Sequence, residues 1–95
     1  MFGEAAADTV HQQPMIFPYH VYILLCGDGH FYVGCTNNLD KRFLRNSKGQ
    51  VHCTRDKLPV ACIAALGFMD KYKAFAFEKY LKTGSGRAFM GRHLI

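Results

Sequence analysis

The chain has 95 residues, of which 49% are hydrophobic and 20% are charged. This length leaves room for one small domain and excludes a multidomain enzyme, and the composition is that of a globular protein. No apolar run approaches the roughly 20 residues that span a bilayer, and the first residues lack the basic and apolar regions of a secretory signal. We therefore expect a cytoplasmic protein with no membrane partner.

The positive charge is distributed unevenly along the chain. The whole chain carries a net +5, but residues 1–19 hold only the acids Glu4 and Asp8, so residues 20–95 carry +7. A basic domain attracts polyanions, and nucleic acid is the most common one in the cytoplasm. The charge therefore points to a nucleic-acid partner, although by itself it fits a role in solubility equally well.

The four cysteines are widely spaced, at Cys26, Cys35, Cys53 and Cys62, and form no C-x-x-C pair. Such spacing disfavours a zinc ribbon, and structural disulfides are rare in cytoplasmic proteins, so no disulfide-linked partner is expected. We predict that the cysteines pack as small hydrophobic side chains in or near the core. A zinc-dependent structural or interaction protein that uses Cys and His is kept as an alternative.

Residues 1–18 are expected to form a flexible leader, because Pro14 and Pro18 interrupt regular structure; residues 19–95 are the predicted domain. Tyr19–Thr36 has the pattern of a β-hairpin, with Gly27-Asp28-Gly29 supplying the tight turn. A three-residue loop puts the apolar residues on one face, namely Val21, Ile23, Leu25, Phe31, Val33 and Cys35. It puts Tyr22 and Tyr32 on the other face, with Gly34 leaving room for something to approach.

Helical patterns follow the hairpin. Asn37–Asp40 predicts a helix start, and the helix is expected to run to about Lys48 and to end at Gly49. Its inward stripe is Leu39 and Phe43, with Arg42 and Asn46 beside that stripe. Gln50–Lys57 is expected to be a basic loop.

The remaining segments complete the predicted fold. Leu58–Phe68 is expected to be a third strand, buried on both faces, because its apolar run is continuous. Asp70 caps a predicted helix over Lys71–Lys82, with Glu78 flanking the apolar stripe of Ala74, Phe77 and Leu81. Gly84–Gly86 is expected to break the chain before a short helix over Arg87–Leu94. The predicted class is α+β, a small three-stranded antiparallel sheet flanked by helices in the order β-β-α-β-α-α.

The order of these elements and residues resembles the GIY-YIG nuclease domain family, specifically its small single-domain bacterial members. Val21-Tyr22-Ile23 stands where the family has its Gly-Ile-Tyr triplet, and Tyr32-Val33-Gly34 stands where it has Tyr-Ile-Gly. Thr36, Arg42 and Glu78 follow in the expected order. The resemblance covers residues 19–94 and implies a metal-dependent DNA endonuclease that hydrolyses a phosphodiester, with nicking as the expected outcome and DNA repair or recombination as the expected setting.

The resemblance also implies a role for each matching residue. Glu78 is expected to hold one Mg²⁺ (or Mn²⁺), since Mg²⁺ keeps most of its waters and needs few protein ligands. Arg42 is expected to clamp the scissile phosphate, Tyr32 to act as the base and Tyr22 to position it. Asn46 stands where such members generally carry a histidine, and asparagine exchanges no proton near neutral pH. The alternative function is therefore a catalytically weakened or inactive nucleic-acid-binding module on the same fold.

Plainer explanations exist for the separate residues: Glu78 could simply pair with Lys82 at i, i+4. DNA is expected to bind mainly through its phosphates, because a chain with no second DNA-binding domain offers chiefly a basic surface. The predicted contact residues are Lys41, Arg45, Lys48, Arg55, Lys57, Lys79, Lys82, Arg87 and Arg92.

Overall fold

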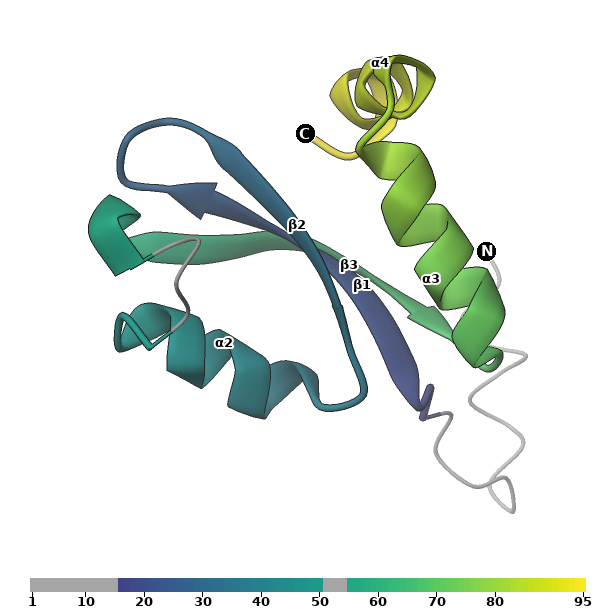
Figure 1. Cartoon of the computed structure of the whole chain (residues 1–95), viewed down its shortest axis with the longest axis horizontal. Helices are drawn as coiled ribbons and strands as arrows, with labels where there is room; N and C mark the ends of the chain where they lie inside the picture. The colour runs from purple at the N-terminus through teal and green to yellow at the C-terminus, as the bar shows by residue number, and fades with distance from the viewer. Residues whose placement is uncertain (1–15, 51–54) are drawn as a thin grey trace, which may run out of the picture.

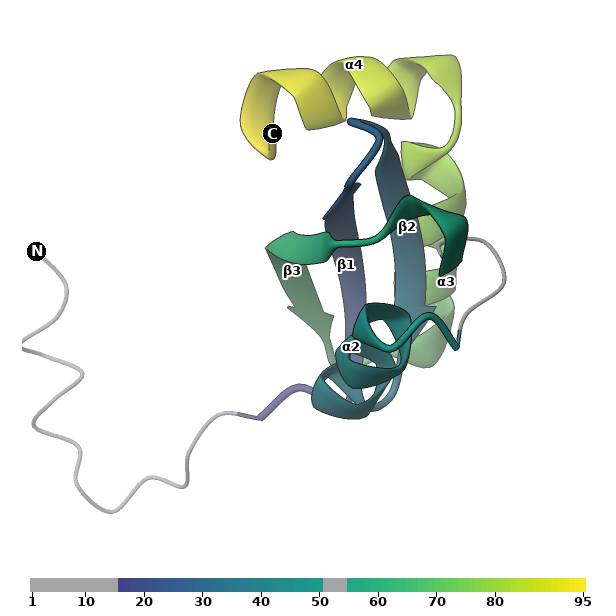
Figure 2. The same ribbon diagram turned by 90° about the vertical axis from the view of Figure 1, so that its left-hand side faces the viewer.

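In the computed structural model, which describes residues 16–50 and 55–95, three strands form one antiparallel sheet in the order β2-β1-β3. The strands are β1 (Tyr19–Cys26), β2 (Phe31–Thr36) and β3 (Val60–Phe68). One face of the sheet is covered by α2 (Leu39–Ser47) and the short 3₁₀ turn η1 (Arg55–Lys57), and the other by α3 (Lys71–Leu81). Figure 2 shows α4 (Gly84–His93) crossing the hairpin end of the sheet. The predicted α+β class and the order β-β-α-β-α-α are confirmed.

The β1–β2 hairpin has the predicted register. Tyr22 pairs with Gly34 and Leu24 with Tyr32, and the Cys26 N–H donates to the His30 carbonyl at 2.8 Å, which closes the three-residue loop. Gly29 has φ +87°, a conformation that glycine adopts without steric cost. The His30 N–H also donates to Asp28 Oδ1 at 3.0 Å. Turn chemistry therefore sets which side chains share a face of the sheet.

The core lies between the sheet and the α3–α4 pair. Its buried members are Val21, Ile23, Val33, Ala74, Leu81 and Met90. The predicted α3 stripe is therefore correct, with Ala74 and Leu81 wholly buried and Phe77 packed against them. Asp70 caps α3 as predicted, its Oδ1 accepting from the Tyr72 and Lys73 N–H groups.

The prediction that β3 is buried on both faces is wrong. β3 is an edge strand, and five of its nine residues are exposed (Ala61, Cys62, Ile63, Ala65 and Gly67). The continuous apolar run resembles a central strand, but among the described residues no fourth strand pairs with the outer edge of β3. Cys62 is thus exposed, against the prediction for the cysteines, whereas Cys26 is buried and Cys35 half-buried; Cys53 lies outside the described residues.

The predicted chain break at Gly84–Gly86 is also wrong, because α4 begins at Gly84 with Thr83 as its cap. Thr83 Oγ1 accepts from the Gly86 N–H at 3.1 Å. A Cβ on Gly86 would overlap the Tyr80 carbonyl oxygen, so this glycine permits close approach of α4 to α3. Of the predicted leader, residues 1–15 lie outside the described part of the chain. No helix within that part is long and apolar enough to cross a membrane.

Candidate active site

Two tyrosines lie side by side on the face of the sheet that α2 covers. The rings of Tyr22 on β1 and Tyr32 on β2 have centroids 6.3 Å apart and are tilted by 45°. Tyr32 is half-buried and lines a groove at the hairpin end of the sheet. Tyr22 is only 1% exposed, and its hydroxyl has no hydrogen-bond partner among the described residues. A buried hydroxyl without a partner costs the fold free energy.

The Tyr22 side chain fills the space beside Gly34. A Cβ on Gly34 would overlap the Tyr22 hydroxyl and contact its ring. The expectation that Gly34 leaves room for an approaching group is therefore wrong, because the Tyr22 ring lies across the glycine. Because Gly34 has no side chain, the bulky Tyr22 ring fits on the central strand of a tightly packed sheet.

Arg42 lies on α2, beside a small basic cavity. The cavity has a volume of about 190 Å³ and is lined by Thr36, Asn37, Asn38, Lys41, Arg42 and Arg45. The Asn38 side chain caps α2 by accepting from the Lys41 N–H at 3.1 Å, and Thr36 Oγ1 accepts from the Asn38 N–H at 3.1 Å. We call this space the basic cavity; three cations and several amide and hydroxyl groups suit it to a phosphate oxygen.

Asn46 does not line the basic cavity, although it is one turn from Arg42. Its side chain is wholly buried, and its Nδ2 donates to the Arg42 carbonyl at 3.0 Å. The predicted inward stripe of α2 is therefore incomplete: Leu39 and Phe43 are half-buried, and the side chain buried most deeply is the polar Asn46.

Glu78 is held by a neighbour on its own helix. Lys82 Nζ lies 2.9 Å from Glu78 Oε2, and the Glu78 side chain is 24% exposed. The i, i+4 pair considered from the sequence is thus present, and such a pair is weak, about 0.2–0.5 kcal/mol. A weak, solvent-accessible ion pair leaves this carboxylate free to exchange Lys82 for another cation.

The Cys35 thiol on β2 is influenced by charged side chains from both α2 and α3. Burial raises the pKa of the Cys35 thiol, Glu78 raises it further and Arg42 lowers it. Glu78 comes from α3 on one face of the sheet, and Arg42 comes from α2 on the other. Both charges therefore influence the same thiol of edge strand β2, from helices on opposite faces of the sheet. The sequence predicted Arg42 and Glu78 as site residues, but no pattern in it indicated that both would influence Cys35.

The donor set fits one hard divalent cation that retains most of its water. Mg²⁺ binds through one or two carboxylates together with substrate phosphate and water, and Glu78 is a partly exposed carboxylate held by a weak pair with Lys82. Over residues 16–50 and 55–95, no three His, Cys, Asp or Glu side chains gather in one place, so no described cluster supports the zinc alternative.

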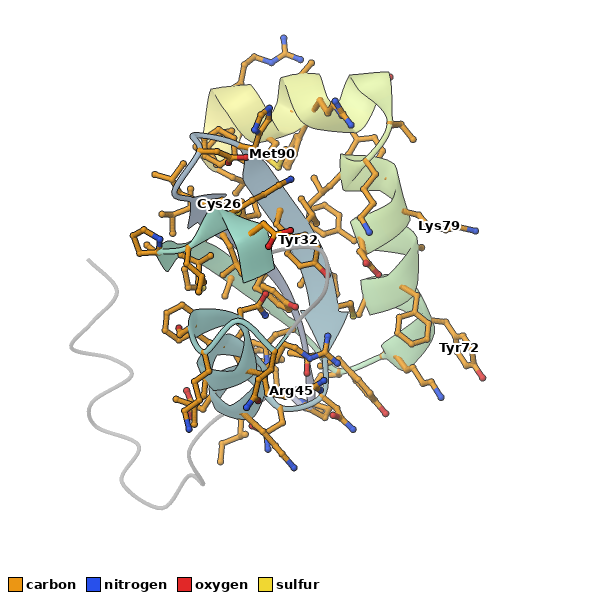
Figure 3. The ribbon with its side chains drawn as sticks, turned by 60° about the vertical axis from the view of Figure 1, so that its left-hand side comes forward. Cys26, Tyr32, Arg45, Tyr72, Lys79 and Met90 are labelled. Carbon is orange, nitrogen blue, oxygen red and sulfur yellow. The ribbon has the colours of Figure 1, made fainter. Side chains whose placement is uncertain are left out.

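The residues predicted to contact DNA lie in several parts of the domain. Lys41 and Arg45 line the basic cavity, and Lys82 and Arg87 line the groove that contains Tyr32. Lys79 projects from α3 away from the sheet, on the side opposite Tyr32 (Figure 3). Of the remaining residues, Lys48 caps the end of α2, Lys57 lies in η1 and Arg92 lies in the last turn of α4.

The three-stranded sheet with its tyrosine pair defines a small nuclease-type α+β domain. The chain matches the GIY-YIG catalytic domain over residues 18–92 and belongs to this family. Its resemblance to that family, expected from the tyrosine triplets, is confirmed, and domains of this family act on nucleic acids.

The relatives are small UPF0213 proteins. The chain is 38% identical over 66 residues to the UPF0213 protein XAC3202 of Xanthomonas axonopodis, covering 68% of this chain and 65% of that protein. It is 39% identical over 64 residues to a UPF0213 protein of Streptococcus pneumoniae, covering 66% and 65%. The match thus spans about two thirds of these relatives' length. The solution NMR structure of the UPF0213 protein BH0048 from Bacillus halodurans has a TM-score of 0.51 at 28% identity, covering 78% of this chain and 82% of that one.

Proposed function

We propose that this protein is a metal-dependent DNA endonuclease that hydrolyses one phosphodiester bond and thereby nicks its substrate. One observation carries this proposal: in a domain of this family, Tyr22 and Tyr32 lie side by side on the sheet, and Arg42 lines a basic cavity with Lys41 and Arg45. Phosphodiester hydrolysis needs a cation on the phosphate and a carboxylate for a metal, and Arg42 and Glu78 are the residues that we assign to these two tasks.

Each side chain has a defined task in this proposal. The Arg42 guanidinium binds two oxygens of the scissile phosphate, with Lys41 and Arg45 holding the phosphate in the basic cavity. Tyr32, in its phenolate form, accepts a proton from the attacking water and becomes the neutral phenol, and the buried Tyr22 hydroxyl positions Tyr32 or that water. Glu78 would hold Mg²⁺ or Mn²⁺ after releasing Lys82. When bound, the metal supplies positive charge that stabilises the charge developing on the phosphate.

Asn46 enters this mechanism only as a positioning residue. It is buried behind Arg42 and is bonded to the Arg42 carbonyl, so it stabilises the turn of α2 that carries the guanidinium. A chain that binds DNA but does not cleave it remains the alternative outcome, because position 46 offers no group that titrates near neutral pH.

The test is nicking of supercoiled plasmid with Mg²⁺ or Mn²⁺ by the full chain and by Glu78→Gln. We expect the rate to fall by more than about 100-fold, since loss of an outer-shell partner alone typically costs 10- to 100-fold. The matched control is Asp56→Asn, the same change at an exposed acid of η1, which should nick as the unmodified chain does.

DNA affinity measured in EDTA, where no metal-dependent cleavage occurs, separates DNA binding from the proposed nuclease activity. Glu78→Gln should bind DNA as tightly as the unmodified chain or more tightly, because it removes a negative charge beside the phosphate. Undiminished nicking by a folded Glu78→Gln protein contradicts the assigned metal site. DNA binding without nicking by the unmodified chain supports the binding-module alternative.

A further inference from the structure

Lys82 stands at the tight corner between α3 and α4, where its backbone is held in place. Its N–H donates to the Lys79 carbonyl at 3.1 Å, and the next residue, Thr83, caps α4. A Cβ on Gly86 would overlap the Tyr80 carbonyl oxygen, so the two helices are close at this corner. The Lys82 side chain, by contrast, is 52% exposed. A fixed backbone with an exposed side chain allows the ammonium group to change partners while the fold stays the same.

The Lys82 side chain contacts one part of the candidate active site and lies near another. Its Nζ is 2.9 Å from Glu78 Oε2, the carboxylate proposed to hold the metal. Lys82 also lines the groove at the hairpin end of the sheet, together with Arg87 and the proposed base Tyr32. DNA that binds beside Tyr32 therefore meets two cations in this groove, and one of them is already paired with Glu78.

The ion pair between Lys82 and Glu78 is weak enough to be exchanged. Pairs between exposed side chains change an equilibrium by only about 1.5- to 5-fold. A divalent cation carries twice the charge of the ammonium group that it would replace on Glu78. A DNA phosphate belongs to a closely spaced row of negative charges, which attracts Lys82 more strongly than a single carboxylate does. Either ligand can therefore take one member of the pair and release the other.

We propose that Lys82 is an exchangeable counter-ion of Glu78, which couples metal binding to DNA binding. The inference rests on the proposed nuclease function and adds a form of regulation to it. When Lys82 binds a phosphate, Glu78 is left open to a metal; when Glu78 holds a metal, Lys82 is left open to DNA. Such coupling is reciprocal, so each ligand raises the affinity for the other by the same factor. Lys82 thus holds the carboxylate until DNA arrives.

A plainer role for the same pair is to stabilise α3. A cation in the last turn of a helix interacts favourably with the helix dipole, and an i, i+4 pair adds to this effect. In that role, Glu78 and Lys82 would affect DNA affinity independently of each other. In an exchange, the effect of removing the Glu78 charge depends on Lys82, because Lys82 is the group that the change releases.

The test is a double-mutant cycle on DNA affinity, measured by fluorescence anisotropy in EDTA with a fully paired duplex. At about 0.15 M salt the Debye length is about 8 Å, so distant charges contribute little. Glu78→Gln keeps the shape of the side chain and removes the charge that holds Lys82. We expect this change to tighten DNA binding about 2- to 5-fold, the range of one released ion pair. In a Lys82→Met background the same change should lose most of that gain.

The matched background is Lys79→Met. Lys79 is a lysine of the same helix that directly follows Glu78 in the sequence, and it projects away from the sheet (Figure 3). In this background the gain from Glu78→Gln should persist in full. Lys82→Gln repeats the comparison with a polar side chain, and circular dichroism verifies that each variant is folded.

An equal gain from Glu78→Gln in the Lys82→Met and Lys79→Met backgrounds overturns the exchange, and so does the absence of any gain in the unmodified chain. These affinities need neither a metal nor cleavage. An additive cycle therefore refutes only this inference, whereas a folded Glu78→Gln protein that still nicks refutes the assigned metal site.

Discussion

Replacing Tyr22 by Phe is expected to leave the fold equally stable or more stable while lowering its nicking rate. The hydroxyl of Tyr22 is buried and has no hydrogen-bond partner among the described residues. The ring itself fills the space above Gly34, and Tyr22→Phe retains that ring. The substitution therefore removes only a polar atom whose partner is missing.

The sign of the stability change follows from the cost of such an atom. Removing the hydroxyl of an ordinary hydrogen-bonded tyrosine lowers the free energy of unfolding by about 0.5–1.5 kcal/mol. An unpaired buried group instead costs the fold about 1–3 kcal/mol, so its removal should raise the free energy of unfolding by up to about 2 kcal/mol. The nicking rate should fall by about 10²-fold or more if the hydroxyl positions the base or the water.

Urea denaturation followed by circular dichroism measures the first quantity, and single-turnover nicking measures the second. Tyr72→Phe is the matched control, because Tyr72 is exposed and projects from α3 away from the sheet (Figure 3); both quantities should stay unchanged. A loss of more than about 0.5 kcal/mol in Tyr22→Phe would show that the hydroxyl is hydrogen-bonded in the folded protein and refute the reasoning.

Three further predictions follow from the same geometry. Gly34→Ala should destabilise the fold by about 1–3 kcal/mol in urea, because its Cβ overlaps the buried Tyr22 ring; a change within 0.5 kcal/mol would contradict that packing. Lys82→Met should raise the Mn²⁺ affinity of the DNA-free protein at least about twofold by electron paramagnetic resonance, because it removes the cation on Glu78, whereas Lys79→Met should not. DNA affinity should fall with salt with a log–log slope of about −4, since five Lys and Arg side chains line the basic cavity and the groove at the hairpin end of the sheet; a flat plot would exclude phosphate-dominated binding.

Much of the candidate site could be predicted because its signals are local. The Gly27-Asp28-Gly29 turn and the alternation of side chains set the hairpin register, and the register puts Tyr22 and Tyr32 on one face. Asn38 and Asp70 mark the helix starts by their capping chemistry. These features depend on neighbours within a few residues, so a pattern in the sequence reports them.

The burial of each side chain could not be predicted in the same way. Leu58–Phe68 has the composition of a central strand, yet it forms the edge of the sheet. Asn46 is polar, yet it is wholly buried under α2, while Leu44 on the same helix is half exposed. Burial depends on which elements are available to cover a surface, and this is a property of distant segments.

The sequence alone determined the order of the elements and the pairing of β1 with β2, and it predicted Tyr22, Tyr32, Arg42 and Glu78 as site residues. Only the tertiary structure decided that α2, which carries Arg42, and α3, which carries Glu78, cover opposite faces of the sheet. It also decided that α4 crosses the hairpin end, where Phe31 and Met90 line one groove. The physical reason is that hairpin pairing and helix capping depend on residues close together in the sequence. A site built from two helices and a sheet edge forms only when distant segments pack, because that packing sets the face of the sheet on which each helix lies.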